Sequence, residues 1–230
     1  MTDRSPEQRR ERLVEVYREA RGCTLCPLAE SRTQVVFGAG DADADLMFIG
    51  EAPGADEDRQ GLPFVGRAGG LLNELLGGVG LGRDEVFVAN VLKCRPPGNR
   101  DPQPVEIDSC RPYLLSQVGL IEPKVIATLG NFATKLITAN QTGITRVRGT
   151  PQVHTLGERT VRVFPILHPA AILRNPGQRP LMEEDFRALA ALVEEPPLEQ
   201  EAVSPPELPA EPRVTTAAPP PSDQLDIFTS

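Results

Sequence analysis

The sequence lacks the features that would indicate a secreted or membrane-spanning protein. No apolar run approaches the roughly 18 residues that a membrane-spanning helix needs. The N-terminal stretch MTDRSPEQRRERL is too charged for a secretory signal, and disulfides are not expected inside the cell. Aromatic residues are scarce, at 4%, but a hydrophobic content of 40% over 230 residues is enough for one ordinary core. We therefore expect a soluble cytoplasmic protein.

An excess of basic residues is also missing, since the formal net charge is -8 at pH 7. Much of this charge lies in residues 196–230, where six acidic residues and one arginine contribute -5. The rest of the chain is therefore close to neutral, and its composition stays compatible with a nucleic-acid partner. Neither a G-x-G-x-x-G motif nor a Walker loop occurs, which argues against a nucleotide-binding protein.

Four short apolar runs alternate with helical patterns along the chain. Such strands, apolar throughout, indicate a parallel sheet covered on both faces, so we predict an α/β protein with a three-layer α/β/α architecture and a central four-stranded parallel sheet. The predicted strands are Leu46–Ile49, Val86–Leu92, Lys124–Leu129 and Val161–Leu167. The predicted helices are Glu7–Ala20, Gly69–Leu76, Val105–Val118, Phe132–Ala139 and Pro180–Val193.

Polar residues follow the ends of these strands. Ligands of open parallel sheets bind beyond the carboxyl ends of the strands, so residues distant in sequence should meet there. The stretch LMFIGEAPGADEDRQGLPFVGRAGGLLNELL, residues 46–76, supplies an acid at a strand end and an aromatic residue in a glycine-flanked loop, which is typical of a pocket. The residues expected at this rim are Glu51, Asn90, Gly130, Asn131 and His168.

The four cysteines form a second candidate site. Cys23 and Cys26 make a C-x-x-C motif, Cys94 follows the second predicted strand and Cys110 lies on the next helix. Their positions outside the apolar strands favour metal ligation over buried or redox-active thiols. Both zinc and an iron-sulfur cluster accept four thiolates, and the wide spacing of the second pair favours iron-sulfur only modestly.

The motifs CTLC, GEAPGADEDRQGLPFVGRAGGLL, NVLKCRPPGNRDP and HPAAILRNP, in this order, resemble those of the family 4 (iron-sulfur) uracil-DNA glycosylases. The resemblance covers roughly Cys23 to Val193. It implies a bacterial, nucleoid-associated DNA repair enzyme and a likeness in fold, with a structural 4Fe-4S cluster on the four cysteines. It also implies hydrolysis of the N-glycosidic bond of uracil in single- or double-stranded DNA by a monomer.

The resemblance assigns roles to the rim residues. By similarity, Phe64 stacks on the flipped uracil, and Asn90 reads its O4 and N3-H edge. His168 stabilises the leaving uracil anion, while Glu51 positions the hydrolytic water. Ala52 also contacts the substrate, and Glu57 crowds the C5 position and excludes thymine. The other histidine, His154, has no motif around it and is expected on the surface.

DNA contacts are expected from backbone groups and two loop residues. The helix start at Gly130 and Asn131 offers N-H groups to one phosphate, and Pro53 and Gly54 allow close approach to another. Leu173 and Arg174 match the loop that enters the duplex. Less specific candidates for contacts to the DNA backbone are Arg146, Arg148 and Arg179. No histidine follows Cys94 in the loop where one branch of the superfamily forms a covalent bond to DNA, so covalent trapping is not expected.

Composition divides the chain into three parts. Residues 1–195 form the predicted glycosylase domain, and residues 196–222 form a disordered, proline-rich acidic linker. Residues 223–230 contain QLDIF, in which Gln224, Leu225, Ile227 and Phe228 resemble the peptide that docks on the bacterial β sliding clamp. An inert tail or another partner, such as a single-strand-binding protein, is the alternative.

Three function classes follow from the sequence. The first is a monofunctional glycosylase, because no lysine or amino-terminal nucleophile lies in the motifs to form a Schiff base. The second is a protein that binds uracil-containing DNA with little turnover. The third is an iron-sulfur protein for electron transfer or nucleotide binding. Release of uracil by the purified protein distinguishes the first class from the others.

Overall fold

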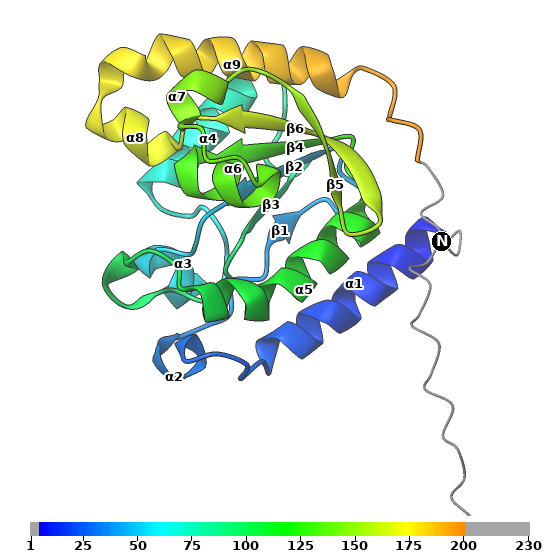
Figure 1. The fold of residues 1–230 in the computed structure, drawn as a ribbon, viewed down its shortest axis with the longest axis vertical. Helices are drawn as coiled ribbons and strands as arrows, with labels where there is room; N and C mark the ends of the chain where they lie inside the picture. The colour runs from blue at the N-terminus through cyan, green and yellow to red at the C-terminus, as the bar shows by residue number, and fades with distance from the viewer. Residues whose placement is uncertain (1–4, 201–230) are drawn as a thin grey trace, which may run out of the picture.

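A six-stranded sheet forms the centre of the computed structural model, which describes residues 5–200 (Figure 1). The strand order is β1-β3-β2-β4-β6-β5. The four inner strands, β3 (Phe87–Asn90), β2 (Leu46–Gly50), β4 (Val125–Leu129) and β6 (Arg159–Ile166), are parallel. These are the four strands that the apolar runs predict, and the mixed α/β class is confirmed.

Two antiparallel edge strands correct the predicted count of four. Strand β1 (Ala39–Gly40) pairs with β3, and β5 (Gln152–Leu156) pairs with β6. Neither has an apolar run: β1 has two residues, and in β5 partly buried residues alternate with exposed ones. An edge strand with one solvated face carries this alternating pattern, which a search for continuous apolar runs passes over.

Helices cover both faces of the sheet. The five predicted helices are present with ends shifted by up to three residues: α1 (Pro6–Arg21), α4 (Arg67–Gly78), α5 (Pro104–Ile121), α6 (Gly130–Thr138) and α9 (Arg179–Val193). Short helices that the sequence reading did not identify are α2 (Leu28–Ser31), α3 (Ala55–Gln60), α7 (Ile144–Val147) and α8 (Pro169–Arg174), with 3-10 turns η1 (Pro97–Asn99) and η2 (Pro176–Gln178).

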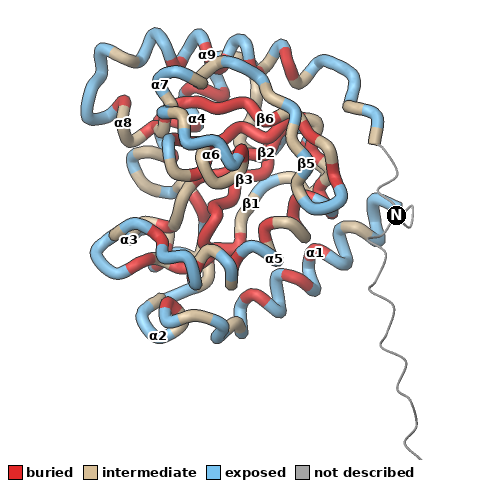
Figure 2. The backbone as a smooth tube through the Cα atoms, in the orientation of Figure 1, coloured by how far each residue is buried: buried red, intermediate tan, exposed pale blue. Residues whose placement is uncertain are grey.

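Residue alternation along each inner strand produces two hydrophobic layers. In β2, Met47 and Ile49 belong to the layer formed with α1, α5 and α6, whereas Leu46 and Phe48 belong to the layer formed with α4, α8 and α9. The inner strands are consequently buried on both sides, which Figure 2 shows as a continuous buried centre. This is the three-layer α/β/α arrangement that the sequence predicts.

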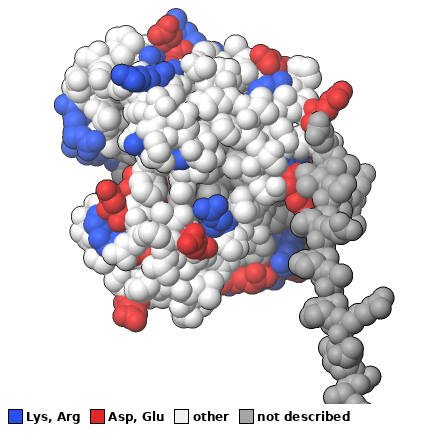
Figure 3. Space-filling model, viewed as in Figure 1, with Lys and Arg blue, Asp and Glu red and all other residues white. Residues whose placement is uncertain are grey.

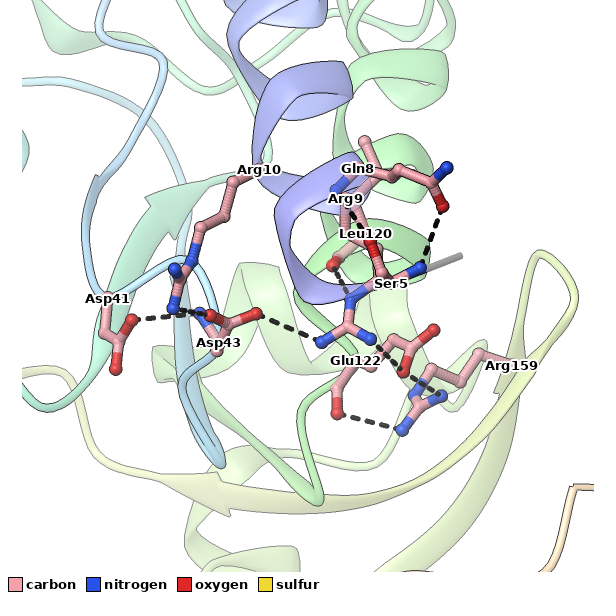
Figure 4. A network of polar contacts seen from close by, with 9 residues as sticks. All are labelled: Ser5, Gln8, Arg9, Arg10, Asp41, Asp43, Leu120, Glu122 and Arg159. Atoms are coloured by element: carbon pink, nitrogen blue, oxygen red, sulfur yellow. Dashed lines mark hydrogen bonds and ion pairs between the residues drawn. The ribbon is translucent and has the colours of Figure 1, made fainter. Parts of the chain in front are cut away.

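A charged network fixes α1 to the amino ends of the parallel strands (Figure 4). Arg9 donates to Asp43 Oδ1 at 3.0 Å and to the Leu120 carbonyl at 3.1 Å, and it pairs with Glu122 at 3.3 Å. Arg159, at the start of β6, donates to the Glu122 carbonyl at 2.8 Å. These residues precede or begin β2, β4 and β6, so the network occupies one end of the sheet and the carboxyl ends remain for a site.

The folded part continues beyond the predicted boundary at residue 195. The Arg162 guanidinium donates to the Pro196 carbonyl at 2.9 Å, and the Gln200 side chain exchanges hydrogen bonds of 3.0 and 2.9 Å with the Thr160 backbone. Residues 196–200 therefore belong to the domain rather than to a linker. The predicted clamp-binding peptide lies outside the described residues.

Within residues 5–200, none of the helices combines the length and apolar character that crossing a bilayer requires.

Candidate active site

A cavity of about 1230 Å³ lies at the carboxyl ends of the parallel strands. It brings together residues from β2, β3, β4 and β6 and the loops that follow them, as the rule for open parallel sheets predicts. Leu173, which is exposed on α8, is not in its lining, and neither are the less specific DNA-contact candidates Arg146, Arg148 and Arg179. The predicted residues that line it are Glu51, Ala52, Pro53, Gly54, Glu57, Phe64, Asn90, Gly130, Asn131, His168 and Arg174.

His168 is held in one tautomer by the start of α8. Its Nδ1 accepts a hydrogen bond from the Ala170 N-H at 3.1 Å, so the proton of the neutral ring resides on Nε2. Burial lowers the pKa of His168 to about 4, and the nearby Arg174 cation adds to this shift while Glu57 opposes it. The imidazole is therefore neutral near pH 7 and offers one N-H donor.

Gly130 allows His168 to lie against the start of α6. Its φ of +87° is in the region that favours glycine, and an added Cβ would come within 3.0 Å of His168 Cβ. The Gly130–Asn131 turn and the histidine therefore form adjacent parts of the cavity wall.

Phe64 forms the wall opposite the histidine. The two ring centroids are 5.8 Å apart with an interplanar angle of 32°, and the Phe64 ring lies over Gly50 at the end of β2. Phe64 has a φ of 56°, a strained value for a bulky residue. Such strain persists only where surrounding contacts hold it, and it is concentrated at functional sites.

Glu57 supplies contacts that hold this loop. One carboxylate oxygen accepts from the Gly54 N-H at 3.1 Å, and the other accepts from the Val65 and Gly66 N-H groups, both at 3.1 Å. The single side chain thus joins the start of α3 to the loop that carries Phe64. Both carboxylate oxygens of Glu57 accept hydrogen bonds from backbone N-H groups. The sequence predicts a carboxylate that faces the substrate and does not predict these backbone contacts.

Asn90 ends β3 with its amide in the cavity lining. The residue is 2% exposed, and no hydrogen bond of its side chain occurs within residues 5–200. Its Oδ1 lies so close to Gly50 that a Cβ there would approach it to 2.4 Å, so the glycine makes room for the amide. The amide is open to the cavity, so its donors and acceptor are free for a ligand with matching groups.

Glu51 follows β2 and has the properties of a potential base. Burial raises its pKa, and the neighbouring Asp101 carboxylate raises it further. No hydrogen bond or ion pair of its carboxylate occurs in the described part of the chain, and it lines the cavity. A carboxylate whose pKa is raised in this way is a better proton acceptor than an exposed carboxylate with an ordinary pKa.

Lys93 is a further residue behind the site that sequence reasoning missed. It is fully buried, and its Nζ donates to the Asn90 carbonyl at 2.8 Å and to Gln117 Oε1 at 2.6 Å. Burial lowers its pKa to about 7. The sequence does contain a signal for this residue, because the lysine follows the apolar run VFVANVL and a lysine buried there needs hydrogen-bond acceptors for its ammonium group. It fixes the strand end that carries Asn90.

The four cysteines are close enough to interact electrostatically, and one of them, Cys110, belongs to α5. Burial raises the pKa of Cys94 to about 11 and also raises that of Cys110, and the charges of the other cysteines add to both shifts. The Arg32 guanidinium donates to Cys94 Sγ, and the Lys93 backbone N-H donates to Cys110 Sγ, both at 3.5 Å. Four thiols, two of them with N-H donors to their sulfurs, fit a group bound as thiolates, including an iron-sulfur cluster.

A single metal ion is the alternative occupant of these cysteines. A tetrahedral zinc ion at 2.3 Å from each sulfur would require the sulfurs to lie within about 4 Å of one another. Within residues 5–200, no three cysteine, histidine or acidic side chains are arranged to hold one ion.

Two arginines suggested for DNA contact make ion pairs within the protein. Arg148 donates to both oxygens of Asp185, at 2.9 and 2.8 Å, and Arg179 pairs with Glu74 and Glu183. Arg148 in particular is mostly buried and serves to hold α9 against the loop before β5. Arg148 is therefore structural, Arg179 stays exposed in its surface ion pairs, and Arg174 lines the cavity.

Comparison with known proteins decides the family. The family model described as the uracil DNA glycosylase superfamily matches residues 37–192, which contain every cavity residue named above. The chain belongs to the uracil-DNA glycosylase superfamily. The resemblance that the sequence motifs carry is thereby confirmed.

Similar superfamily members carry the name type-4 uracil-DNA glycosylase. The one from Sulfurisphaera tokodaii is 47% identical over 185 residues, which cover 78% of this chain and 84% of the relative. The one from Archaeoglobus fulgidus is 45% identical over 187 residues (79% and 94%), and the one from Thermotoga maritima is 46% identical over 168 residues (72% and 86%). The similarity extends over most of both chains in each pair.

Two adjacent glycines of α4 test how this superfamily member positions Phe64. A Cβ at Gly69 would lie 1.7 Å from the Phe64 carbonyl oxygen, whereas one at Gly70 meets nothing within 4 Å. We expect Gly69→Ala to destabilise the protein by more than about 2 kcal/mol. Gly70→Ala should stabilise it by about 0.5 to 1 kcal/mol, because alanine favours the helix. Equal unfolding free energies of the two variants in urea would contradict the close contact.

The neutral state of His168 can be measured directly, because the chain has only two histidines. In a His154→Gln variant, the remaining imidazole signal in a proton NMR titration belongs to His168. Its pKa of about 4 predicts no titration between pH 8 and 6 and a midpoint well below the ordinary 6.5. A midpoint near 6.5 would show that the ring is not desolvated.

Proposed function

We propose that this chain is a DNA repair glycosylase that hydrolyses the bond between uracil and deoxyribose and leaves an abasic site. The observation that carries the proposal is the meeting of a neutral histidine donor, an unpartnered asparagine amide and an aromatic ring in one cavity. Uracil presents a flat face for the ring and alternating donors and acceptors for the polar groups. The superfamily membership and the names of the relatives support the same reaction.

Recognition of uracil falls to Phe64 and Asn90. The base stacks on the Phe64 ring, which the loop holds opposite His168. Asn90 accepts from N3-H and donates to O4, and this pairing fails with cytosine, which has an acceptor and a donor at the corresponding positions. Ala52 borders the bound base. Glu57, fixed by its three backbone contacts, crowds C5 and disfavours the methyl group of thymine.

Bond cleavage falls to His168 and Glu51. As the glycosidic bond breaks, negative charge develops on uracil O2, and the Nε2-H of neutral His168 donates to it. Positive charge develops on the sugar, which the Glu51 carboxylate stabilises while it orients the attacking water. The water transfers one proton to the Glu51 carboxylate as its oxygen bonds to the sugar carbon, and the bond from that carbon to uracil breaks with its electron pair on uracil, which departs as the anion. No lysine nucleophile takes part, so the DNA strand is not cut.

DNA is held by the rim around the cavity. The backbone N-H groups of Gly130 and Asn131, at the start of α6, bind one phosphate. Pro53 and Gly54 allow close backbone approach to a second phosphate, and they offer no free N-H because proline has none and the Gly54 N-H is bound by Glu57. Leu173 and Arg174, on α8 beside His168, enter the space that the base leaves. The substrate is uracil-containing DNA, single- or double-stranded, and the protein acts as a monomer in the bacterial cytoplasm.

A 4Fe-4S cluster on Cys23, Cys26, Cys94 and Cys110 is the proposed cofactor. Its four thiolate bonds would hold the loop after α1, the loop after β3 and α5 together, so its contribution is structural. Arg32 and the Lys93 N-H stabilise two of the thiolates. Iron and acid-labile sulfide in the purified protein test this assignment, and zinc in their place would overturn it.

The C-terminal peptide is proposed to bind the β sliding clamp through Gln224, Leu225, Ile227 and Phe228. Tethering to a clamp raises the local concentration of the enzyme on newly made DNA. A titration with the isolated clamp should show binding by the wild type and none by the Gln224→Ala/Phe228→Ala double variant. Equal binding by both proteins would refute the proposal.

Single-turnover release of uracil from an oligonucleotide tests the function. We expect His168→Ala to reduce the rate by about 10²- to 10³-fold, as for loss of one donor to a developing oxyanion. Glu51→Ala should also release uracil more slowly than the wild type. His154→Ala is the matched control, since that histidine lies on the edge strand β5 outside the cavity lining, and it should keep the wild-type rate.

Two results would contradict the assignment. No release of uracil by the iron-loaded wild type would remove the enzymatic function and leave a protein that binds uracil-containing DNA. A His168→Ala rate equal to that of His154→Ala would show that the histidine donor does not take part.

A further inference from the structure

The cavity is larger than one base requires. Its volume of about 1230 Å³ exceeds the roughly 300–1000 Å³ of sites that enclose drug-sized ligands. The proposed uracil contacts account for only the part near β2, β3 and His168. The rest of the lining comes from α5, α6, the segment around η1 and residues 139–144, and no role has been assigned to the side chains of α5 and α6.

Each of these two helices contributes a stripe of side chains to the wall. On α5 the stripe consists of Ile107 and Arg111, four residues apart and therefore on one helical face. On α6 it consists of Phe132, Lys135 and Leu136, again at helical spacing. Apolar and cationic side chains are mixed in both stripes. We refer to these five residues as the α5–α6 wall.

The charges of the wall are available to a ligand. Neither Arg111 nor Lys135 forms an ion pair with any of residues 5–200, whereas Arg100, another cation of the cavity, is bound by Glu106 at 3.0 Å. The carboxylates in the lining, Glu51, Glu57 and Asp101, come from the segments after β2 and η1 and not from α5 or α6. Figure 3 shows basic and acidic side chains scattered over the face that includes α5 and α6, without a broad patch of either sign. The two free cations therefore favour an anionic ligand at this wall.

We propose that the α5–α6 wall binds the single-stranded nucleotides next to the flipped uracil. Arg111 and Lys135 contact their phosphates, and Phe132, flanked by Ile107 and Leu136, provides a surface on which an unstacked base rests. Single-strand sites combine cations along the backbone with aromatic rings in this way. A duplex would present phosphates but keep its bases stacked, so it would leave the apolar part of the wall unused. The inference rests on the proposed function, because the wall continues the uracil cavity.

The test measures binding to uracil-free single-stranded DNA, separately from uracil release. Wild type, Arg111→Ala, Lys135→Ala and Phe132→Leu are titrated with oligonucleotides of about 15 nucleotides, near the upper end of single-strand site sizes, and of about three nucleotides. Arg18→Ala is the matched control, because Arg18 is exposed on α1 and does not line the cavity. The Arg111 variant is checked for iron content, since Cys110 precedes it; Lys135→Ala, on a different helix, tests the wall independently.

Each cation variant should weaken binding to the long oligonucleotide and reduce the slope of log affinity against log salt by about 0.7, the effect of one single-strand phosphate. Phe132→Leu should weaken it by roughly 5- to 100-fold, with the salt slope unchanged, as loss of stacking on one base does. The same substitutions should weaken binding to duplex DNA of the same length less than they weaken binding to the single strand. Salt slopes equal to that of Arg18→Ala, or an equal loss on duplex, would overturn the inference. Absence of uracil release by the wild type would instead contradict the proposed function, so the two failures are distinguishable.

Discussion

The carboxylate of Glu57 makes the contact on which the geometry of the site depends most. Its three hydrogen bonds to Gly54, Val65 and Gly66 join the two ends of the loop that forms one wall of the cavity. Between these ends lies Phe64, whose backbone has a strained left-handed conformation and whose ring faces His168. Without an acceptor at this place, three backbone N-H groups would lose their partner and nothing would offset the strain.

The opposite side of the cavity is fixed by a different set of contacts. The Lys93 ammonium ties the carbonyl of Asn90 to Gln117 on α5, and the Lys93 N-H reaches Cys110 on the same helix. The strand end that presents the asparagine is thereby linked to the cysteines. His168 is fixed by the first turn of α8 through Nδ1. The His168 ring and the strand end that carries Asn90 are thus held by contacts within the protein, and such fixed groups favour electrostatic stabilisation of a developing charge.

The inner part of the fold could be predicted from the sequence because its signal is simple. Strands buried on both faces must be apolar throughout, and β2 and β4 meet this requirement along their whole length. The carboxyl-end rule then placed Glu51, Asn90 and His168 at one rim without any alignment. The motifs of the family added Phe64, which no periodicity would have singled out.

The remaining features depend on contacts between distant residues and have no local pattern. Strand β5 is defined by its pairing with β6, and the left-handed backbone of Phe64 by Glu57 and by its contact with Gly69. The contacts of Gln200 with Thr160 likewise extend the domain beyond a boundary that composition placed at residue 195. The partners of Lys93, Arg148 and Arg179 are similarly set by the tertiary fold.

The specificity of Glu57 variants tests most directly whether the site depends on this carboxylate. Release of uracil and of thymine from mismatched oligonucleotides should be measured for the wild type, Glu57→Gln and Glu57→Ala. If the carboxylate holds the loop, both variants lose uracil release, Glu57→Ala more than Glu57→Gln, and any release of thymine is accompanied by this loss. Wild-type release of uracil accompanied by efficient release of thymine would contradict the account and leave Glu57 as a steric barrier alone.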